Sequence, residues 1–173
     1  MRNKIITVFG SAFTKPEDKY YSEVEEIGKL LAERGYSVCS GGYAGIMEAV
    51  SKGAKSVKGK TIGITVAGWT AKPNQYLDEV VEMPNLMERI MELITISDGY
   101  IVLKGGAGTL TELAITLELM NKISIPEKPI YIYKGFWHDV LETLKLDSEK
   151  LSALIDRNIN YFNEPGEITV LLN

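Results

Sequence analysis

Short apolar runs alternate with longer segments of helical periodicity along most of the chain. The apolar runs are rich in β-branched residues and end at glycine or polar residues, which predicts short buried strands. They cover residues 4–9, 36–39, 60–66, 79–83, 99–103 and 128–133, with residues 159–162 as a candidate last strand. Strands that are apolar throughout are typical of a parallel sheet covered on both faces.

The intervening segments place apolar residues every three or four positions, which predicts amphipathic helices. The first helix is expected to begin at residues 14–17 (TKPE) and to stop at Gly35. Pro84 is expected in the first turn of a helix over residues 84–97. Further helices are expected over residues 46–57, 109–121, 136–144 and 148–157, and in the tail from residue 164.

This order predicts an α/β fold, with a Rossmann-like doubly wound parallel sheet and helices on both faces. Residues 1–173 are expected to form a single domain. Ligands of such sheets bind beyond the carboxyl ends of the strands. Glycine-rich turns follow the first, second and fifth predicted strands, so a ligand site is expected where these turns meet.

Composition narrows the classes of function. Hydrophobic residues make up 45% and charged residues 24% of the 173 residues, as in soluble globular proteins. The net charge of −4 supplies no general basic field for nucleic acid, although a small cationic pocket is not excluded. The chain has neither an apolar run of about 18 residues nor a signal-peptide pattern. We therefore expect a cytoplasmic protein with no membrane or nucleic-acid partner.

The single cysteine and the single histidine limit metal and redox chemistry. Cys39 alone cannot form an internal disulfide or a multi-cysteine zinc site, and it is interpreted as a core residue. His138 alone makes a histidine-built metal centre improbable, and a surface or packing role is expected for it. No metal ion and no organic cofactor are expected.

Glycine-rich segments join three strands to the helices that follow them. Glycine lets backbone N–H groups approach a ligand, and a helix N-terminus offers unpaired N–H groups that suit phosphate. The alternative is tight strand-to-helix packing with no ligand, but two such loops at one sheet edge favour phosphate. Neither loop is a Walker loop or a complete G-x-G-x-x-G motif. The candidate phosphate-binding residues are Gly10, Ser11, Gly41, Gly42, Gly45, Gly105, Gly106, Gly108 and Thr109.

Glu112 and Arg89 are the candidates for chemistry, and each has a second interpretation. If Thr109 is an N-cap, Glu112 stands at the N3 position and completes a capping box that serves only its own helix. The same position also places a carboxylate beside any ligand at that helix end. Arg89 lies at the edge of an apolar helix stripe, where it either pairs with Glu88 or Glu92 at the surface or enters the site.

The chain resembles the LOG (LONELY GUY) family, whose hallmark is a Pro-Gly-Gly-x-Gly-Thr-x-x-Glu motif. Residues 104–112 read KGGAGTLTE, residues 8–11 (VFGS) look like the family's first phosphate-side turn, and residues 40–49 (SGGYAGIMEA) look like its second. The segment around Arg89 is similar to the helix that supplies the family's arginine. The resemblance covers roughly residues 4–145.

This resemblance implies a Rossmann-like nucleotide-binding domain that forms a homodimer or a higher homo-oligomer and binds an AMP-like nucleoside 5′-monophosphate. It implies hydrolysis of the N-glycosidic bond, with release of base and ribose 5-phosphate, and it assigns the catalytic pair to Glu112 and Arg89. The "lysine decarboxylase" label carried by many relatives is rejected, because nothing in the sequence marks a pyridoxal phosphate lysine. The alternative is a non-catalytic binding or carrier protein for a nucleotide or a molybdenum-cofactor-like ligand.

Two residues depart from the family pattern. Lys104 stands where the family has proline, and Ile90 follows the arginine where stricter cytokinin-activating members have lysine. These departures count against a specific cytokinin substrate and leave the nucleotide site in place.

Overall fold

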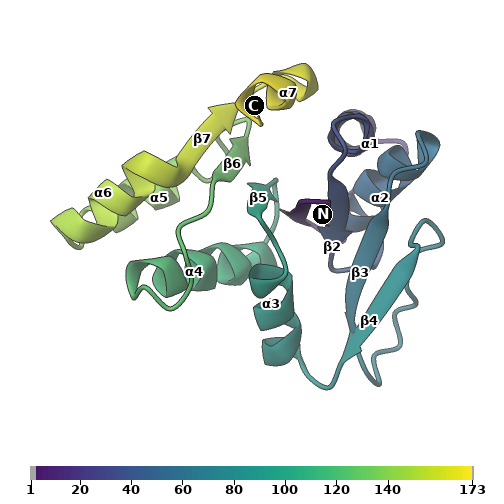
Figure 1. Cartoon of the computed structure of the whole chain (residues 1–173), viewed down its shortest axis with the longest axis horizontal. Coiled ribbons are helices and arrows are strands. Elements are labelled where there is room, and N and C mark those ends of the chain that lie inside the picture. Colours follow the sequence, from purple (N-terminus) through teal and green to yellow (C-terminus); the bar gives the residue numbers. More distant parts are fainter. Residues whose placement is uncertain (1–2, 173) are drawn as a thin grey trace.

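The computed structural model describes residues 3–172 as one seven-stranded parallel sheet between two layers of helices (Figure 1). The strands are β1 (Ile5–Phe9), β2 (Ser37–Ser40), β3 (Thr61–Val66), β4 (Glu79–Met83), β5 (Gly99–Val102), β6 (Ile130–Tyr133) and β7 (Ile159–Phe162). The helices are α1 (Lys19–Glu33), α2 (Ile46–Ser56), α3 (Leu86–Thr95), α4 (Ala107–Asn121), α5 (His138–Lys145), α6 (Glu149–Asn158), the 3-10 turn η1 (Pro165–Glu167) and α7 (Ile168–Leu171). The α/β, doubly wound fold class is confirmed. The outermost parts of the expected domain, residues 1–2 and 173, lie outside the described residues.

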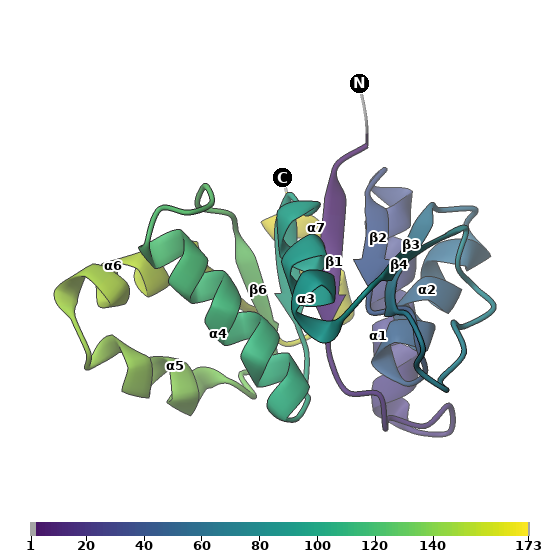
Figure 2. The ribbon, with the colours of Figure 1, turned by 90° about the horizontal axis from the view of Figure 1, so that it is seen from below.

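The strand order is β4-β3-β2-β1-β5-β6-β7, and every neighbouring pair is parallel. The chain builds outward from β1 through β2 and β3 to β4, and then returns to place β5 on the other side of β1. This reversal is the topological switch point, where ligands of doubly wound sheets bind. Figure 2 shows the loop after β1 and the beginning of α4 at the same edge of the sheet.

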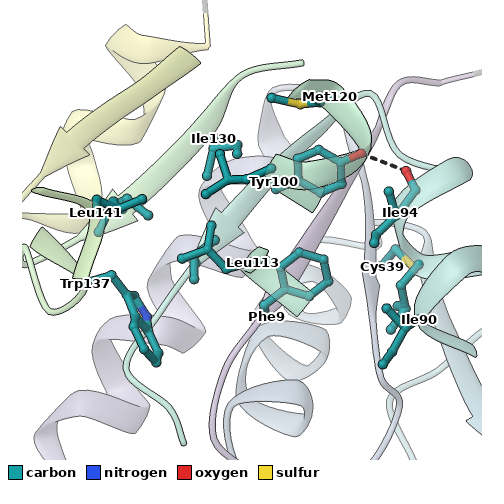
Figure 3. Close-up of a cluster of buried hydrophobic side chains, with 14 of the residues drawn as sticks. Phe9, Cys39, Ile90, Ile94, Tyr100, Leu113, Met120, Ile130, Trp137 and Leu141 are labelled. Carbon is teal, nitrogen blue, oxygen red and sulfur yellow. Dashed lines mark hydrogen bonds between the residues drawn. The ribbon is translucent and has the colours of Figure 1, made fainter. Parts of the chain in front are cut away.

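The central strands β1, β2, β5 and β6 contribute to two apolar layers, because successive side chains point to opposite faces. In β1, Ile5 and Phe9 belong to the layer that includes side chains of α3, α4, α5 and α6, whereas Ile6 and Val8 belong to the layer that includes side chains of α1, α2 and α7. Figure 3 shows the first of these layers, in which Phe9 stacks on Tyr100 at 5.8 Å between ring centroids. Burial on both faces explains why the predicted strands show no polar alternation. Cys39 belongs to this core, as expected.

The first helix begins later than the sequence signature indicated. Residues 14–17 were expected to start it, but α1 begins at Lys19 with Asp18 as its N-cap residue. The Lys15 N–H donates to Asp18 Oδ2 at 2.8 Å, and the Asp18 N–H donates to Lys15 O at 3.0 Å. Pro16 therefore lies in a turn, which the φ angle of proline suits as well as a helix start. The loop after β1 is longer as a result and extends along the sheet edge.

α3 also begins later than expected. Asn85 is its N-cap residue, and the side chain accepts a hydrogen bond from the Glu88 N–H at 3.0 Å. Pro84 precedes this cap and does not lie in the first turn.

Among residues 3–172 no helix combines the length and the hydrophobicity needed to cross a bilayer.

A loop over residues 67–78 joins the parallel neighbours β3 and β4 without a helix. Asn74 anchors it to the turn after β2: its backbone N–H donates to Gly42 O at 2.8 Å, and its side-chain amide donates to Tyr43 O at 3.0 Å. The anchored loop carries Trp69 to the carboxyl edge of the sheet.

Candidate functional site

A cavity of about 430 Å³ lies beyond the carboxyl ends of β1 and β5. This volume is within the range of roughly 300–1,000 Å³ that is common for small-molecule sites. The structure brings seven of the predicted site residues into the wall of this first cavity: Gly10, Ser11, Arg89, Gly106, Gly108, Thr109 and Glu112.

Arg89 reaches the cavity from α3 and is held there by backbone carbonyls. Only 6% of the residue is exposed. Its Nε donates to Ile64 O at 2.7 Å, and its Nη2 donates to Gly41 O at 3.1 Å. Both carbonyls lie at the carboxyl edge of the sheet, in β3 and just after β2. The interpretation in which Arg89 pairs with Glu88 or Glu92 at the surface is therefore wrong.

Arg89 and Glu112 form the charged pair of the cavity. Nη1 of Arg89 lies 3.8 Å from Oε1 of Glu112, and the two side chains are 8% and 12% exposed. Burial raises the pKa of Glu112 to about 7, and the guanidinium acts against this rise. Burial lowers the pKa of Arg89, and the carboxylate opposes that shift. At 3.8 Å the groups attract each other without a direct hydrogen bond, so the carboxylate can accept one from a ligand or water.

Glu112 does not serve as a helix cap. α4 begins at Ala107 with Gly106 as its N-cap residue, so Thr109 is already inside the helix and Glu112 lies almost one turn further on. The capping-box interpretation is therefore wrong. The sequence pattern was misleading because glycine, which has no side chain to mark it as a cap, takes the N-cap position.

The first turn of α4 forms one wall of the cavity. Ala107, Gly108 and Thr109 line it, and the N–H groups of a first helical turn have no partner within the helix. Together with the helix dipole, such N–H groups favour an anion at this end. Thr109 is 4% exposed and fits closely against Gly105, where an added Cβ would meet Thr109 Oγ1 at 2.1 Å.

The glycines after β2 lie behind the cavity and not in its wall. A Cβ on Gly41 would lie 1.7 Å from Nη2 of Arg89, so only glycine lets the guanidinium approach this backbone. Gly45 has φ +70, and a Cβ there would meet Ser11 O at 2.5 Å. Gly42 has φ +78, and its carbonyl accepts the Asn74 N–H. These glycines hold the turn, the arginine and the loop after β1 together.

Ser11 ties the two central loops to each other. Its N–H donates to Lys104 O at 3.1 Å, and its Oγ accepts from the Phe13 N–H at 3.0 Å. The loop after β1 is therefore fixed to the end of β5, next to the first turn of α4.

Tyr43 and Trp69 belong to the cavity wall and were not predicted. Their rings stack with centroids 5.7 Å apart and an interplanar angle of 22°. Cζ of Arg89 lies 5.6 Å from the Tyr43 ring centroid and 5.9 Å from that of Trp69, which is 47% exposed. No local sequence pattern marks Trp69 as a site residue. It reaches the site only because the anchored loop over residues 67–78 carries it there.

Among residues 3–172 no group of three or more metal-ligating side chains of the His, Cys, Asp or Glu type was found.

The fold and this cavity define a Rossmann-like protein with a helix N-terminus and a buried Arg–Glu pair at the switch point of a parallel sheet. The chain belongs to the SLOG cluster4 family, whose profile matches residues 3–157. The resemblance to LOG proteins seen in the sequence is thereby confirmed.

Curated relatives are about a third identical to this chain over the residues that align with it. An uncharacterized protein of Archaeoglobus fulgidus is 33% identical over 67% of this chain and 76% of its own length. The pyrimidine/purine nucleotide 5′-monophosphate nucleosidase of Escherichia coli is 30% identical over 58% of this chain and 24% of its own length. The rice protein named probable cytokinin riboside 5′-monophosphate phosphoribohydrolase LOGL5 is 30% identical over 81% of this chain and 58% of its own length. This chain thus spans about a quarter of the nucleosidase and somewhat more than half of the rice protein.

Solved structures with the same fold include molybdenum cofactor proteins. The molybdenum cofactor binding protein of Rippkaea orientalis is 27% identical, with a TM-score of 0.77 over 99% of this chain and 96% of that chain. The molybdenum cofactor carrier protein of Chlamydomonas reinhardtii has a TM-score of 0.79 at 21% identity over 99% of this chain and 96% of that chain, a likeness of fold alone.

Proposed function

We propose that this protein binds a nucleoside 5′-monophosphate and hydrolyses its N-glycosidic bond. The observation that carries the proposal is the buried Arg89–Glu112 pair, which shares one cavity with the first turn of α4. An anion-binding helix end and a carboxylate poised near neutral pH are what such a reaction requires from a protein.

The three parts of a nucleotide match three parts of the cavity. The phosphate accepts hydrogen bonds from the N–H groups of Gly108 and Thr109 at the start of α4. The base lies at the aromatic end formed by Tyr43 and Trp69. The ribose then lies between them, next to Glu112. Binding of the phosphate in this way positions the scissile bond against the carboxylate.

In the reaction, a water oxygen bonds to C1′ of the ribose while the C1′–N bond breaks. The electron pair of that bond leaves with the base, and positive charge develops on the ribose ring. The carboxylate of Glu112 stabilises this charge, accepts a proton from the water and passes it to the departing base. Arg89, fixed by Ile64 O and Gly41 O, stabilises negative charge on the base without having to reorganise.

Two of the relatives support this assignment. The Escherichia coli nucleosidase and the rice phosphoribohydrolase are both named for nucleoside 5′-monophosphate substrates. The proposed substrate is AMP-like, and the reaction needs neither a metal ion nor an organic cofactor.

The proposal is tested by measuring base release from a panel of nucleoside 5′-monophosphates. We expect wild-type protein to release free base from AMP or a related monophosphate, and Glu112→Gln to lose this activity. Glu118→Gln is the matched control, because Glu118 lies on the same helix with a 58% exposed side chain. If wild-type protein releases base from no member of the panel, the hydrolase assignment is wrong.

The second candidate is a carrier that binds a nucleotide or a molybdenum-cofactor-like ligand without chemistry. It is favoured by the Rippkaea orientalis protein, which matches nearly the whole chain. Ligand binding without turnover, and an affinity that Glu112→Gln leaves unchanged or improves, would support the carrier over the hydrolase.

We also propose that the protein is a cytoplasmic homodimer. Exposed apolar side chains lie on the two helices that carry Arg89 and Glu112, namely Met87 (56%) and Met91 (36%) on α3 and Leu110 (37%) on α4. Such side chains are suited to burial against a second copy of the chain. Light scattering that gives the mass of one chain at micromolar concentration would contradict the dimer.

A further inference from the structure

A second cavity of about 660 Å³ lies beside the first one. Ser11, Phe13 and Gly106 line both cavities, so the two share a wall. The second cavity is also within the size range of small-molecule sites. A nucleoside monophosphate that occupies the first cavity leaves this space unused.

The shared wall is where the proposed phosphate would lie. The Ser11 N–H donates to Lys104 O, which joins the loop after β1 to the end of β5. Gly106 immediately precedes the first turn of α4, whose residues Ala107, Gly108 and Thr109 line the first cavity. A phosphate held by that turn therefore has the base end of the site on one side and the second cavity on the other.

Lys104 gives the second cavity a cation. The residue lines the second cavity and is absent from the wall of the first. Its backbone N–H donates to the Tyr20 hydroxyl at 2.9 Å, which fixes the position of its Cα. None of the ion pairs found within residues 3–172 involves its ammonium group.

The other polar residues in the wall of the second cavity suit a ligand that carries hydroxyl groups. Asp18 is the carboxylate of this wall, and one of its oxygens already accepts the Lys15 N–H at 2.8 Å. Carboxylates commonly accept hydrogen bonds from ribose hydroxyls. Thr14 and Tyr20 add hydroxyl groups, and the 91% exposed Phe13 adds an apolar face.

We propose that the protein binds nucleotides linked through a pyrophosphate to a sugar. The first phosphate occupies the α4 end, the second phosphate faces the ammonium of Lys104, and the sugar lies beside Asp18 in the second cavity. This inference rests on the proposed function, because both use the same phosphate position.

The test is calorimetric titration of the full chain with AMP, ADP and ADP-glucose. Lys104→Ala removes the cation and keeps the N–H that donates to Tyr20. Lys122→Ala is the matched control, because it removes an equal charge from an exposed position at the far end of α4. We expect ADP and ADP-glucose to bind wild-type protein more tightly than AMP. Lys104→Ala should weaken both by about tenfold, as expected for a hydrogen bond to a charged group, and should leave AMP unaffected.

The outcomes separate this inference from the proposed function. If AMP binds and ADP-glucose binds more weakly than AMP, the inference is overturned and the proposed function stands. The inference is also overturned, and the proposed function stands, if Lys104→Ala and Lys122→Ala change the affinity for ADP-glucose equally. If none of the three nucleotides binds, the inference is overturned, and the base-release panel alone decides the proposed function.

Discussion

The guanidinium of Arg89 and the carboxylate of Glu112 lie 3.8 Å apart in the first cavity. The two residues belong to different helices, α3 before β5 and α4 after it along the chain. The pair combines two opposing effects. Burial disfavours the charge on each group, and each charge partly compensates for the burial of the other. The result is a carboxylate whose pKa lies near 7, close to the value that suits a general base at neutral pH.

The first prediction concerns the pH dependence of catalysis. In the proposed reaction Glu112 is a base and must be ionised, and burial raises its pKa to about 7 in the free protein. We expect kcat/KM for base release to fall about tenfold per pH unit below that value and to level off above it. Initial rates between pH 5 and 9 measure this profile. A rate constant that stays flat from pH 5 to pH 8 would contradict the assigned role.

The second prediction concerns stability. Glu112 has a folded-state pKa above its unfolded value, so the folded protein binds more protons between about pH 4.5 and pH 7. The stability contributed by the protonated carboxyl is fully present below the unfolded pKa and is lost as the pH rises through the folded pKa. The loss is on the order of 3 kcal/mol in the free energy of unfolding. Urea denaturation across this window should show the loss in wild-type protein and a smaller pH dependence in Glu112→Gln, and equal pH dependence in both would contradict it.

The third prediction concerns the anchoring of the arginine. Arg89→Lys keeps the positive charge, but one ammonium cannot replace both the Nε bond to Ile64 O and the Nη2 bond to Gly41 O. We expect a loss of about 1 to 3 kcal/mol in the free energy of unfolding, because a buried carbonyl loses its partner. Base release should fall by at least about tenfold, because Arg89 is no longer preorganised. Wild-type activity in this variant would show that charge alone is sufficient.

The fourth prediction compares two glycines. A Cβ on Gly41 would meet Arg89 Nη2 at 1.7 Å and Met47 Sδ at 2.7 Å, so Gly41→Ala must displace the arginine. We expect it to destabilise the fold by about 1 to 3 kcal/mol and to reduce base release. Gly166→Ala is the matched control, because nothing lies within 4 Å of its added Cβ and the residue lines neither cavity. Thermal unfolding that ranks the two variants in the opposite order would contradict this account.

The fifth prediction concerns recognition of the base. Trp69→Ala removes the half-exposed ring of the stacked pair and should weaken AMP binding by about tenfold, the scale of one base–aromatic contact. Ribose 5-phosphate has no base, so its affinity should not change. Phe136→Ala is the matched control, because that ring is also 47% exposed but lines neither cavity. Equal losses for AMP and ribose 5-phosphate would place the base elsewhere.

The hydrophobic pattern of the sequence determined the elements and the class of fold. β4 and β7 have the predicted bounds, and the remaining strands differ from prediction by one or two residues. The predictions for the central strands succeed because burial on both faces of a parallel sheet requires continuous apolar runs, a local property of the chain. The edge strands β4 and β7 are partly exposed, and their β-branched and aromatic residues indicated a strand. The strands were predicted to be parallel, so the glycine turns that follow β1, β2 and β5 were predicted to meet at one edge of the sheet.

The first residues of the helices and the hydrogen-bond partners of the site residues were determined only by the tertiary structure. The Thr-x-x-Glu spacing left a capping box open as a second interpretation of Glu112, because the actual N-cap residue, Gly106, carries no side chain that marks it. Arg89 had two equal interpretations in the sequence. Its hydrogen-bond acceptors, Ile64 O and Gly41 O, lie 25 and 48 residues away along the chain. A local pattern reports only on neighbours within a few residues, so burial of the arginine depends on the strand order that brings β2, β3 and α3 together.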